Sequence, residues 1–262
     1  MRAMQNYARA RTRKRMITMA LDSSTDVCSA ALVQNGAVLD ERLNRNGSNH
    51  AALLPKYVQE LQAEATSRSL TIDRIVLSEG PGSYTGLRIG ASLAKGLCYG
   101  ADLPLDAVPT LAVIAFAAKT AMLKEQEAKN KEQETRTSYL ICPMIDARRM
   151  EVYCALYNAD LRVVQELKAK VIDEQSFSDV LNEHEIYFCG NGAEKCKSVI
   201  RHPHAHWIDD IVPTGALAGQ LADALNDRTD LVRTISDKQI AYFEPNYLKE
   251  FIAAPSHVKG LH

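Results

Sequence analysis

The chain has 262 residues, of which 46% are hydrophobic and 24% are charged, and its formal net charge is −1. This composition is typical of a soluble globular protein. No apolar run approaches the roughly 20 residues that span a bilayer. The 6% of aromatic residues argues against an aromatic platform for single-stranded nucleic acid.

Residues 1–15, MRAMQNYARARTRKR, hold six basic side chains and no acidic one. They lack the apolar core of a signal peptide and the serines of a transit peptide. We therefore expect a disordered, dispensable leader, with Met16 as an alternative start. Without it the chain carries 25 basic and 32 acidic residues. An acidic body is not expected to hold a nucleic acid on its own, so any work on nucleic acid would have to be done through a partner.

The first half of the chain predicts three strands followed by a helix, a strand, a helix, a strand and a helix. The predicted strands are 16–22, 27–34, 37–45, 72–80 and 103–109, and the helices are 50–68, a segment from Ser83, and a segment from Thr110. Asn35-Gly36 joins the second and third strands as a hairpin turn. This order is that of a ribonuclease-H-like unit.

The second half repeats the pattern after a charged stretch, KEQEAKNKEQETRT. Strands are predicted at 138–146, 151–157, 162–171 and 185–193, with helices near 173–182 and 213–226. In both halves the hairpin turn follows 14 residues after an aspartate, from Asp22 to Gly36 and from Asp146 to Asp160. The repeat indicates a duplication.

The predicted fold class is therefore α/β, an actin-like (ASKHA) duplication of two ribonuclease-H-like domains. The predicted division is a leader at 1–15, an N-terminal domain at 16–118, a charged connection at 119–137 and a C-terminal domain at 138–262.

In such a fold ATP binds between the halves, where the first turn of each half supplies an aspartate and glycines. Here the first turn reads DSSTDVCS and the second DARRMEVY, and neither contains a glycine. Asp22, Ser23, Ser24 and Thr25 are candidates for a weak nucleotide contact. The alternative is that Asp22 caps the turn and Thr25 satisfies local backbone groups.

No pattern of catalytic residues or metal ligands stands out. The six cysteines form no C-x-x-C pair and predict buried free thiols. His202, His204 and His206 alternate around a proline and predict a surface loop. We predict no catalytic residue and no metal site in this chain.

The segment EGPGSYTGLRIGASLAKGLCYG, residues 79–100, holds six of the 13 glycines, although from Ser83 onward it otherwise looks helical. Glycine in a helix interior costs roughly 1 kcal/mol relative to alanine. A phosphate loop is one explanation, because Gly80-Pro81-Gly82 supplies a turn at a helix N-terminus. Close helix packing is the explanation we favour, because Gly86 and Gly90 lie one turn apart. Whether the partner helix is intramolecular stays open.

Several stretches together resemble the bacterial TsaB (YeaZ) family. They are LDSSTDVCSAALVQNG, HAALLPKYVQEL, GPGSYTGLRIGASLAKGL, IDARRMEVYCALY, GNGA and EPNYLKEF. The resemblance runs from Met16 nearly to the end, and the GPGSYTGLRIG string is its most specific part. It implies a cytoplasmic, noncatalytic relative of TsaD, formerly labelled an M22 glycoprotease homologue.

The resemblance implies that the chain pairs with TsaD, joined by the ATPase TsaE, for threonylcarbamoylation of adenosine 37 in tRNA. TsaD-type proteins carry a metal-binding histidine pair where this chain has VPTLAVIAFA, residues 108–117. We therefore expect no cofactor in the chain by itself, with a nucleotide only at the interface of the complex. An actin-superfamily small-molecule kinase and an M22-type peptidase remain the alternatives.

In the family the pairing surface is built from the first two helices. It maps here onto His50, Leu53, Leu54, Tyr57, Tyr84, Thr85, Gly86, Leu87, Arg88, Gly90 and Ala91. The implied role of the glycines is to thin the second helix where the partner docks. Without a partner, the same helices are expected to form a homodimer.

Overall fold

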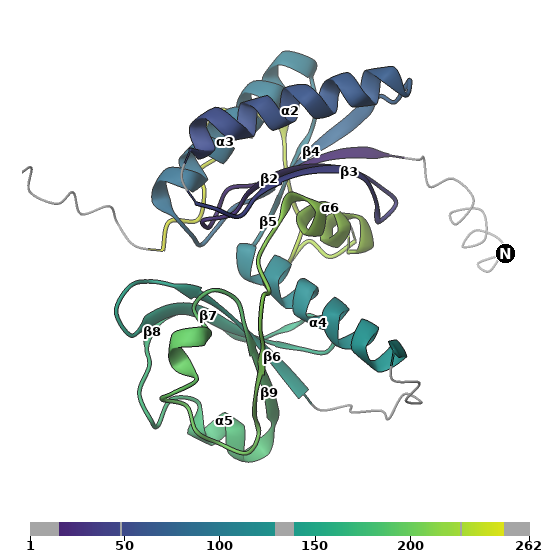
Figure 1. The fold of residues 1–262 in the computed structure, drawn as a ribbon. Coiled ribbons are helices and arrows are strands. Elements are labelled where there is room, and N and C mark those ends of the chain that lie inside the picture. The colour runs from purple at the N-terminus through teal and green to yellow at the C-terminus, as the bar shows by residue number, and fades with distance from the viewer. Residues whose placement is uncertain (1–15, 48, 129–138, 226, 249–262) are drawn as a thin grey trace, which may run out of the picture.

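A computed structural model describes residues 16–47, 49–128, 139–225 and 227–248. The chain forms two α/β lobes, one built on a six-stranded sheet and the other on a five-stranded sheet (Figure 1). This arrangement confirms the predicted actin-like duplication. The predicted leader and residues 129–137 of the charged connection lie outside the described residues.

The first sheet has the strand order β11-β5-β4-β1-β2-β3. Its strands are β1 (Ile17–Asp22), β2 (Cys28–Gln34), β3 (Ala37–Asn44), β4 (Ile72–Ser78), β5 (Leu105–Val108) and β11 (Arg233–Ile235). The first three are antiparallel, and β4 and β5 extend the sheet in parallel. The predicted turn at Asn35-Gly36 is confirmed, with φ angles of 50° and 79° in the left-handed region that this turn requires.

The second sheet has the order β10-β9-β6-β7-β8. Its strands are β6 (Tyr139–Asp146), β7 (Glu151–Asn158), β8 (Val163–Val171), β9 (Glu185–Cys189) and β10 (Ala205–Ile208). Strand β6 has an antiparallel neighbour, β7, on one side and a parallel neighbour, β9, on the other. Strand β1 lies in the same way between β2 and β4, so the repeat predicted from the turn spacing is present in the sheets.

Two long helices, α2 (His50–Ser67) and α3 (Tyr84–Ala101), cover the outer face of the first sheet (Figure 1). Leu54, Val58 and Leu61 of α2 and Ala94 of α3 pack in one apolar cluster with Met19 of β1. Three shorter helical elements are α5 (Ser178–Glu183), η1 (Glu194–Cys196) and α7 (Asp237–Ile240). Helix α5 begins at Ser178 rather than near 173, because residues 174–177 form turns.

The helices between the sheets are exchanged between the two halves. Helix α4 (Thr110–Ala128) follows β5 in the chain but packs against β6 of the second sheet, whereas α6 (Gly215–Ala224) follows β10 but packs against β1 and β2. One apolar cluster joins Ile114 of α4 and Leu221 of α6 to both sheets. The lobes therefore share a core (Figure 1).

The predicted domain boundaries are wrong at two places. Residue 118 lies inside α4, and the segment after β10 returns to the first lobe instead of completing a C-terminal domain at 138–262. Strand β11 pairs antiparallel with β5, and α6 covers the first sheet. The second lobe is thus an insertion between α4 and α6.

A buried ion-pair cluster holds this returning segment in place. Arg74 of β4 contacts Asp106 of β5 at 2.6 Å and Asp223 of α6 at 2.5 Å. Thr234 of β11 donates to Asp106 at 2.6 Å. The guanidinium and its two buried carboxylate partners fix α6 and β11 against the sheet, because a buried charge that loses its partner destabilises the folded state.

The prediction that the histidine-rich segment is a surface loop is wrong at His206. His206 lies in β10, at the edge of the second sheet, and not in a loop. Its ring stacks on Tyr187 at a centroid distance of 4.9 Å, and its Nε2 bonds the carboxylate of Glu185. The prediction failed because the acid that pairs with it comes from another strand.

Candidate partner-binding face and interlobe cleft

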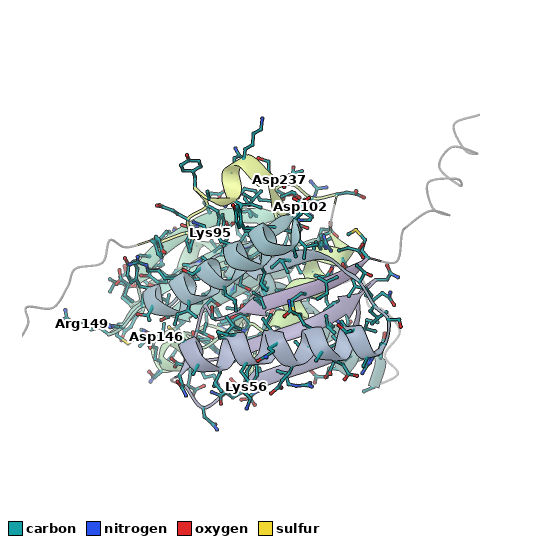
Figure 2. All side chains as sticks on the ribbon, turned by 90° about the horizontal axis from the view of Figure 1, so that it is seen from above. Lys56, Lys95, Asp102, Asp146, Arg149 and Asp237 are labelled. Atoms are coloured by element: carbon teal, nitrogen blue, oxygen red, sulfur yellow. The ribbon has the colours of Figure 1, made fainter. Side chains whose placement is uncertain are left out.

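Helices α2 and α3 run side by side and form one broad face of the first lobe. Figure 2, which views this face from above, shows Lys56 on α2 and Lys95 on α3. The hydroxyl of Ser83 accepts a hydrogen bond from the backbone N–H of Gly86 at 3.3 Å and so caps α3. His50, at the start of α2, bonds the carbonyl oxygen of Thr25 through Nε2 at 2.9 Å.

Gly86 and Gly90 do not face a partner. A Cβ on Gly86 would lie 2.0 Å from the carbonyl oxygen of Ser23. A Cβ on Gly90 would lie 2.5 Å from the Ser23 hydroxyl and 3.1 Å from Leu77. The proposed role of thinning the helix for a partner is therefore wrong. Gly86 admits the backbone of the loop between β1 and β2, and Gly90 admits the side chains of Ser23 and Leu77, so neither position has room for a side chain of its own.

Five of the eleven predicted partner-binding residues are buried within this chain. They are Leu54, Gly86, Leu87, Gly90 and Ala91. They cannot offer side-chain surface, because they pack α2 and α3 onto the sheet beneath. The other six are half-buried or exposed and keep the predicted role as a prediction: His50, Leu53, Tyr57, Tyr84, Thr85 and Arg88.

The side of α3 that faces solvent forms what we call the outer crest. It consists of Thr85, Arg88, Ser92, Gly96 and Tyr99, all exposed, and Tyr99 is 91% exposed. A Cβ on Gly96 would meet nothing within 4 Å. Ser92, Gly96 and Tyr99 were not among the predicted partner-binding residues. The signal was present, because Ser92, Gly96 and Gly100 repeat every four residues on the side opposite Gly86 and Gly90.

A cleft of about 600 Å³ lies between the lobes. Ser24, Thr25 and Ser83 line it from the first lobe, and Asp146 and Arg148 line it from the second. It thus lies where the first turns of the two halves face each other. Among the predicted nucleotide-contacting residues, only Ser24 and Thr25 reach this space.

Asp22 and Ser23 lie behind the cleft wall. Asp22 is fully buried, and burial raises the pKa of its carboxyl to about 6, against the lowering effect of hydrogen bonds that include those from Ser24. Ser24 donates to Asp22 Oδ1 from its N–H at 3.1 Å and from its hydroxyl at 3.0 Å. The Ser23 hydroxyl donates to the Gly86 carbonyl at 2.9 Å. Both side chains are thus engaged in hydrogen bonds within the chain. For Asp22 this is the turn-capping role that was the alternative to a nucleotide contact.

The corresponding turn of the second lobe is closed by its own side chains. Asp146 Oδ1 accepts hydrogen bonds from the N–H of Arg148 at 2.8 Å and from Lys195 Nζ at 2.5 Å. Arg148 and Arg149 have φ angles of 71° and 50°, which is left-handed backbone that glycine adopts more easily. The aspartate of this turn is therefore already paired with a cation of its own lobe.

The described residues contain no group of three or more His, Cys, Asp or Glu side chains arranged to hold a metal ion. At the start of α4, Thr110 to Ala115 are buried, and the Thr110 hydroxyl accepts from the Gly80 N–H at 3.1 Å. All six cysteines are buried free thiols, as predicted. Within the described part of the chain, no helix has the length and apolar character to cross a membrane.

Two ribonuclease-H-like lobes that exchange a helix beside a cleft define the actin-like ATPase class of fold. Solved structures agree. The chain is similar to YeaZ from Pseudomonas aeruginosa, with a TM-score of 0.67 at 23% identity, covering 89% of this chain and 100% of that one. A second structure, of an uncharacterized protein from the same species with similarity to peptidase YEAZ, has a TM-score of 0.68 at 22% identity with the same coverage.

Residues 41–250 match the family model of TsaD, tRNA N6-adenosine threonylcarbamoyltransferase, and the chain belongs to this family, in its TsaB (YeaZ) branch. The tRNA threonylcarbamoyladenosine biosynthesis protein TsaB of Bacillus subtilis is 26% identical over 244 residues, which are 89% of this chain and 94% of that protein. TsaB of Escherichia coli is 34% identical over 145 residues, 55% of this chain and 56% of that protein. The resemblance seen in the sequence is confirmed.

Proposed function

We propose that the chain acts in tRNA threonylcarbamoyladenosine biosynthesis as a noncatalytic subunit that binds a TsaD-type enzyme through the outer face of α2 and α3. The observation that carries the proposal is the outer crest of α3. It combines small residues, an arginine and a tyrosine exposed to 91%. Tyrosine and arginine are enriched in protein interfaces, and small residues let helix backbones approach closely.

The noncatalytic part of the proposal rests on the aspartates that would bind nucleotide in an active ATPase of this fold, because neither of them is free to do so here. Asp22 is sealed from the cleft, and Asp146 is paired with Lys195. The residues from Thr110 to Ala115 offer no imidazole, where the TsaD enzymes that the chain resembles hold a histidine pair. A nucleotide that contacts Ser24 and Thr25 at the interface of the complex remains part of the proposal, as does the ATPase TsaE as a third component.

The test measures by calorimetry whether the purified chain binds the TsaD homologue from the same genome. Gly96→Arg places a long side chain on the outer crest, where a Cβ meets nothing within 4 Å. We expect this variant to stay folded and to lose the partner. Ala169→Arg, at an exposed position of β8, is the matched control and should bind like the wild type. No binding by the wild type, or full binding by Gly96→Arg, contradicts the proposal.

A small-molecule kinase is the second candidate, because the cleft of about 600 Å³ is open to Ser24 and Thr25. A kinase binds ATP and magnesium without a partner, whereas the proposed subunit alone shows no ATP turnover. ATP hydrolysis by the isolated chain that disappears in Asp22→Ala would therefore replace the proposal. A homodimer through the α2 and α3 face is expected of the isolated chain, and light scattering tests it.

A further inference from the structure

A polar groove of about 380 Å³ lies between α3 and the segment that follows α7. Arg88 and Lys95 of α3 line one wall, and Phe243, Glu244 and Tyr247 line the other. The groove runs along the edge of the outer crest that is farther from α2. It therefore extends the proposed partner-binding face onto a second part of the chain.

The outer wall of the groove is anchored to the lobe. The N–H of Asn246 donates to the carbonyl oxygen of Glu79 at 2.7 Å. Lys95 Nζ donates to the carbonyl oxygen of Ala241 at 3.0 Å, so the segment is tied to α3 itself. Figure 2 shows Lys95 on α3 beside the short helix α7, which carries Asp237. The groove is thus a feature of the folded lobe.

Arg88 is held in position by the Tyr84 ring, which in turn packs against Tyr247. Its Nη1 donates to the Tyr84 hydroxyl at 3.0 Å, and its guanidinium lies 5.4 Å from the centroid of the same ring. The Tyr84 ring packs against Tyr247 at a centroid distance of 5.0 Å. A guanidinium oriented in this way loses less conformational entropy when it binds, and its remaining N–H groups suit a carboxylate.

The charge of the groove differs from that of the rest of the chain. After residue 15 the chain carries 25 basic and 32 acidic residues, whereas the groove holds Arg88 and Lys95 with the single acid Glu244. Among the described residues neither Arg88 nor Lys95 forms an ion pair. They lie seven positions apart on the helix, which places them about 10 Å apart along the axis.

We propose that this groove takes carboxylate side chains from a helix of the partner protein, with Arg88 and Lys95 as the two receiving cations. Two acidic residues seven apart on a helix have the same spacing of about 10 Å. The inference rests on the proposed function, because it names what the partner brings to the α2 and α3 face. Tyr84 and Tyr247 act as positioning residues for Arg88.

The experiment compares the double variant Arg88→Glu/Lys95→Glu with the wild type in calorimetry against the purified TsaD homologue. We expect binding roughly a hundredfold weaker, and a smaller loss of affinity when salt is raised. Lys124→Glu/Lys168→Glu is the matched control, because it makes the same charge change at two exposed positions outside this face. Its affinity should stay near that of the wild type. Circular dichroism verifies folding, and Arg88→Gln/Lys95→Gln replaces the reversal if that variant unfolds.

Each other outcome overturns the inference in a distinguishable way. If the charge-reversed variant binds as tightly as the wild type, the groove is not the receiving site, although the proposed function stands. If the wild type does not bind the TsaD homologue, the proposed function fails and the groove assignment with it. If inorganic phosphate binds the isolated wild type but not the reversed variant, the groove is a small-anion site instead. Tyr247→Ala should weaken binding about tenfold with both cations retained.

Discussion

The hydroxyl of Ser23 donates a hydrogen bond of 2.9 Å to the carbonyl oxygen of Gly86, so the loop after β1 lies directly on the first turn of α3. The contact joins a position that would hold phosphate in an active ATPase to the helix that carries the proposed partner-binding crest. No side chain fits between them, because a Cβ on Gly86 would lie 2.0 Å from the Ser23 carbonyl oxygen.

Gly86→Ala should therefore destabilise the protein, although alanine is the better helix former. The added methyl group has to displace the Ser23 backbone, and overpacking of this kind costs roughly 2–3 kcal/mol. Gly96→Ala is the control, because a Cβ there meets nothing within 4 Å. It should stabilise the protein by up to about 1 kcal/mol. Urea denaturation measures both, and equal effects of the two substitutions would contradict the packing at Ser23.

The same geometry predicts the effect of Gly90→Leu. A Cβ at this position already lies 2.5 Å from the Ser23 hydroxyl, so a leucine side chain has no space. We expect the variant to unfold rather than to fold and lose its partner. A folded variant with native circular dichroism would show that the β1–β2 loop moves aside.

Asp22→Asn should make the protein more stable near pH 7. Burial raises the pKa of Asp22 from 3.8 to about 6. The folded state therefore binds more protons than the unfolded state between these values, and this group lowers the free energy of unfolding as pH rises through that window. The gain from the substitution should reach about 3 kcal/mol above pH 6 and vanish below pH 4. Denaturation of both proteins across pH 3.5–7.5 measures it, and a pH-independent difference contradicts the burial of a charge.

Arg74→Met should be strongly destabilising, because it leaves Asp106 and Asp223 as buried carboxylates without their cation. The expected loss is about 3–5 kcal/mol. Arg42→Met is the control, since Arg42 also contacts two carboxylates but its side chain is 32% exposed. It should cost less than about 1 kcal/mol. Similar losses for the two variants would mean that the buried cluster does not hold α6 and β11.

The cysteine thiols should not react with thiol reagents in the folded protein. All six cysteines are buried, and burial raises the pKa of Cys28 to about 11 and that of Cys98 to about 12. The reactive thiolate of these two residues is thus scarce, and burial shields all six sulfur atoms from reagents. A colour-forming disulfide reagent at pH 8 should label no cysteine within minutes, and all six in urea. Fast labelling of the native protein would place at least one thiol at the surface.

The sequence predicted the sheets better than the connections between them. The Asn35-Gly36 turn between two strand-like runs defines the β2–β3 hairpin locally, so that part needed no knowledge of the rest of the chain. Strand β11 has three residues, and its partner β5 lies more than 120 residues earlier. No local pattern reveals such a pairing. The acids that neutralise Arg74 are likewise distant in sequence, at Asp106 and Asp223.

The prediction of which side of α3 faces a partner failed for a different reason. Helical periodicity shows which residues share a side but not which side is inside. Gly86, Gly90 and Ala94 form one row of small residues, and Ser92, Gly96 and Gly100 form another. Gly86 and Gly90 of the first row were predicted to face a partner, and the structure places them against Ser23 and Leu77. Two equivalent small faces cannot be told apart without the loop that fills one of them.

The exchange of α4 and α6 between the lobes has a consequence for synthesis on the ribosome. Strands β1 and β2 are complete by residue 34, yet the helix that covers their inner face begins only at Gly215. Throughout the intervening translation, one apolar side of the first sheet has no cover from its own chain. This apolar side of the first sheet therefore stays uncovered until α6 has been synthesised, and the two lobes complete their folding together.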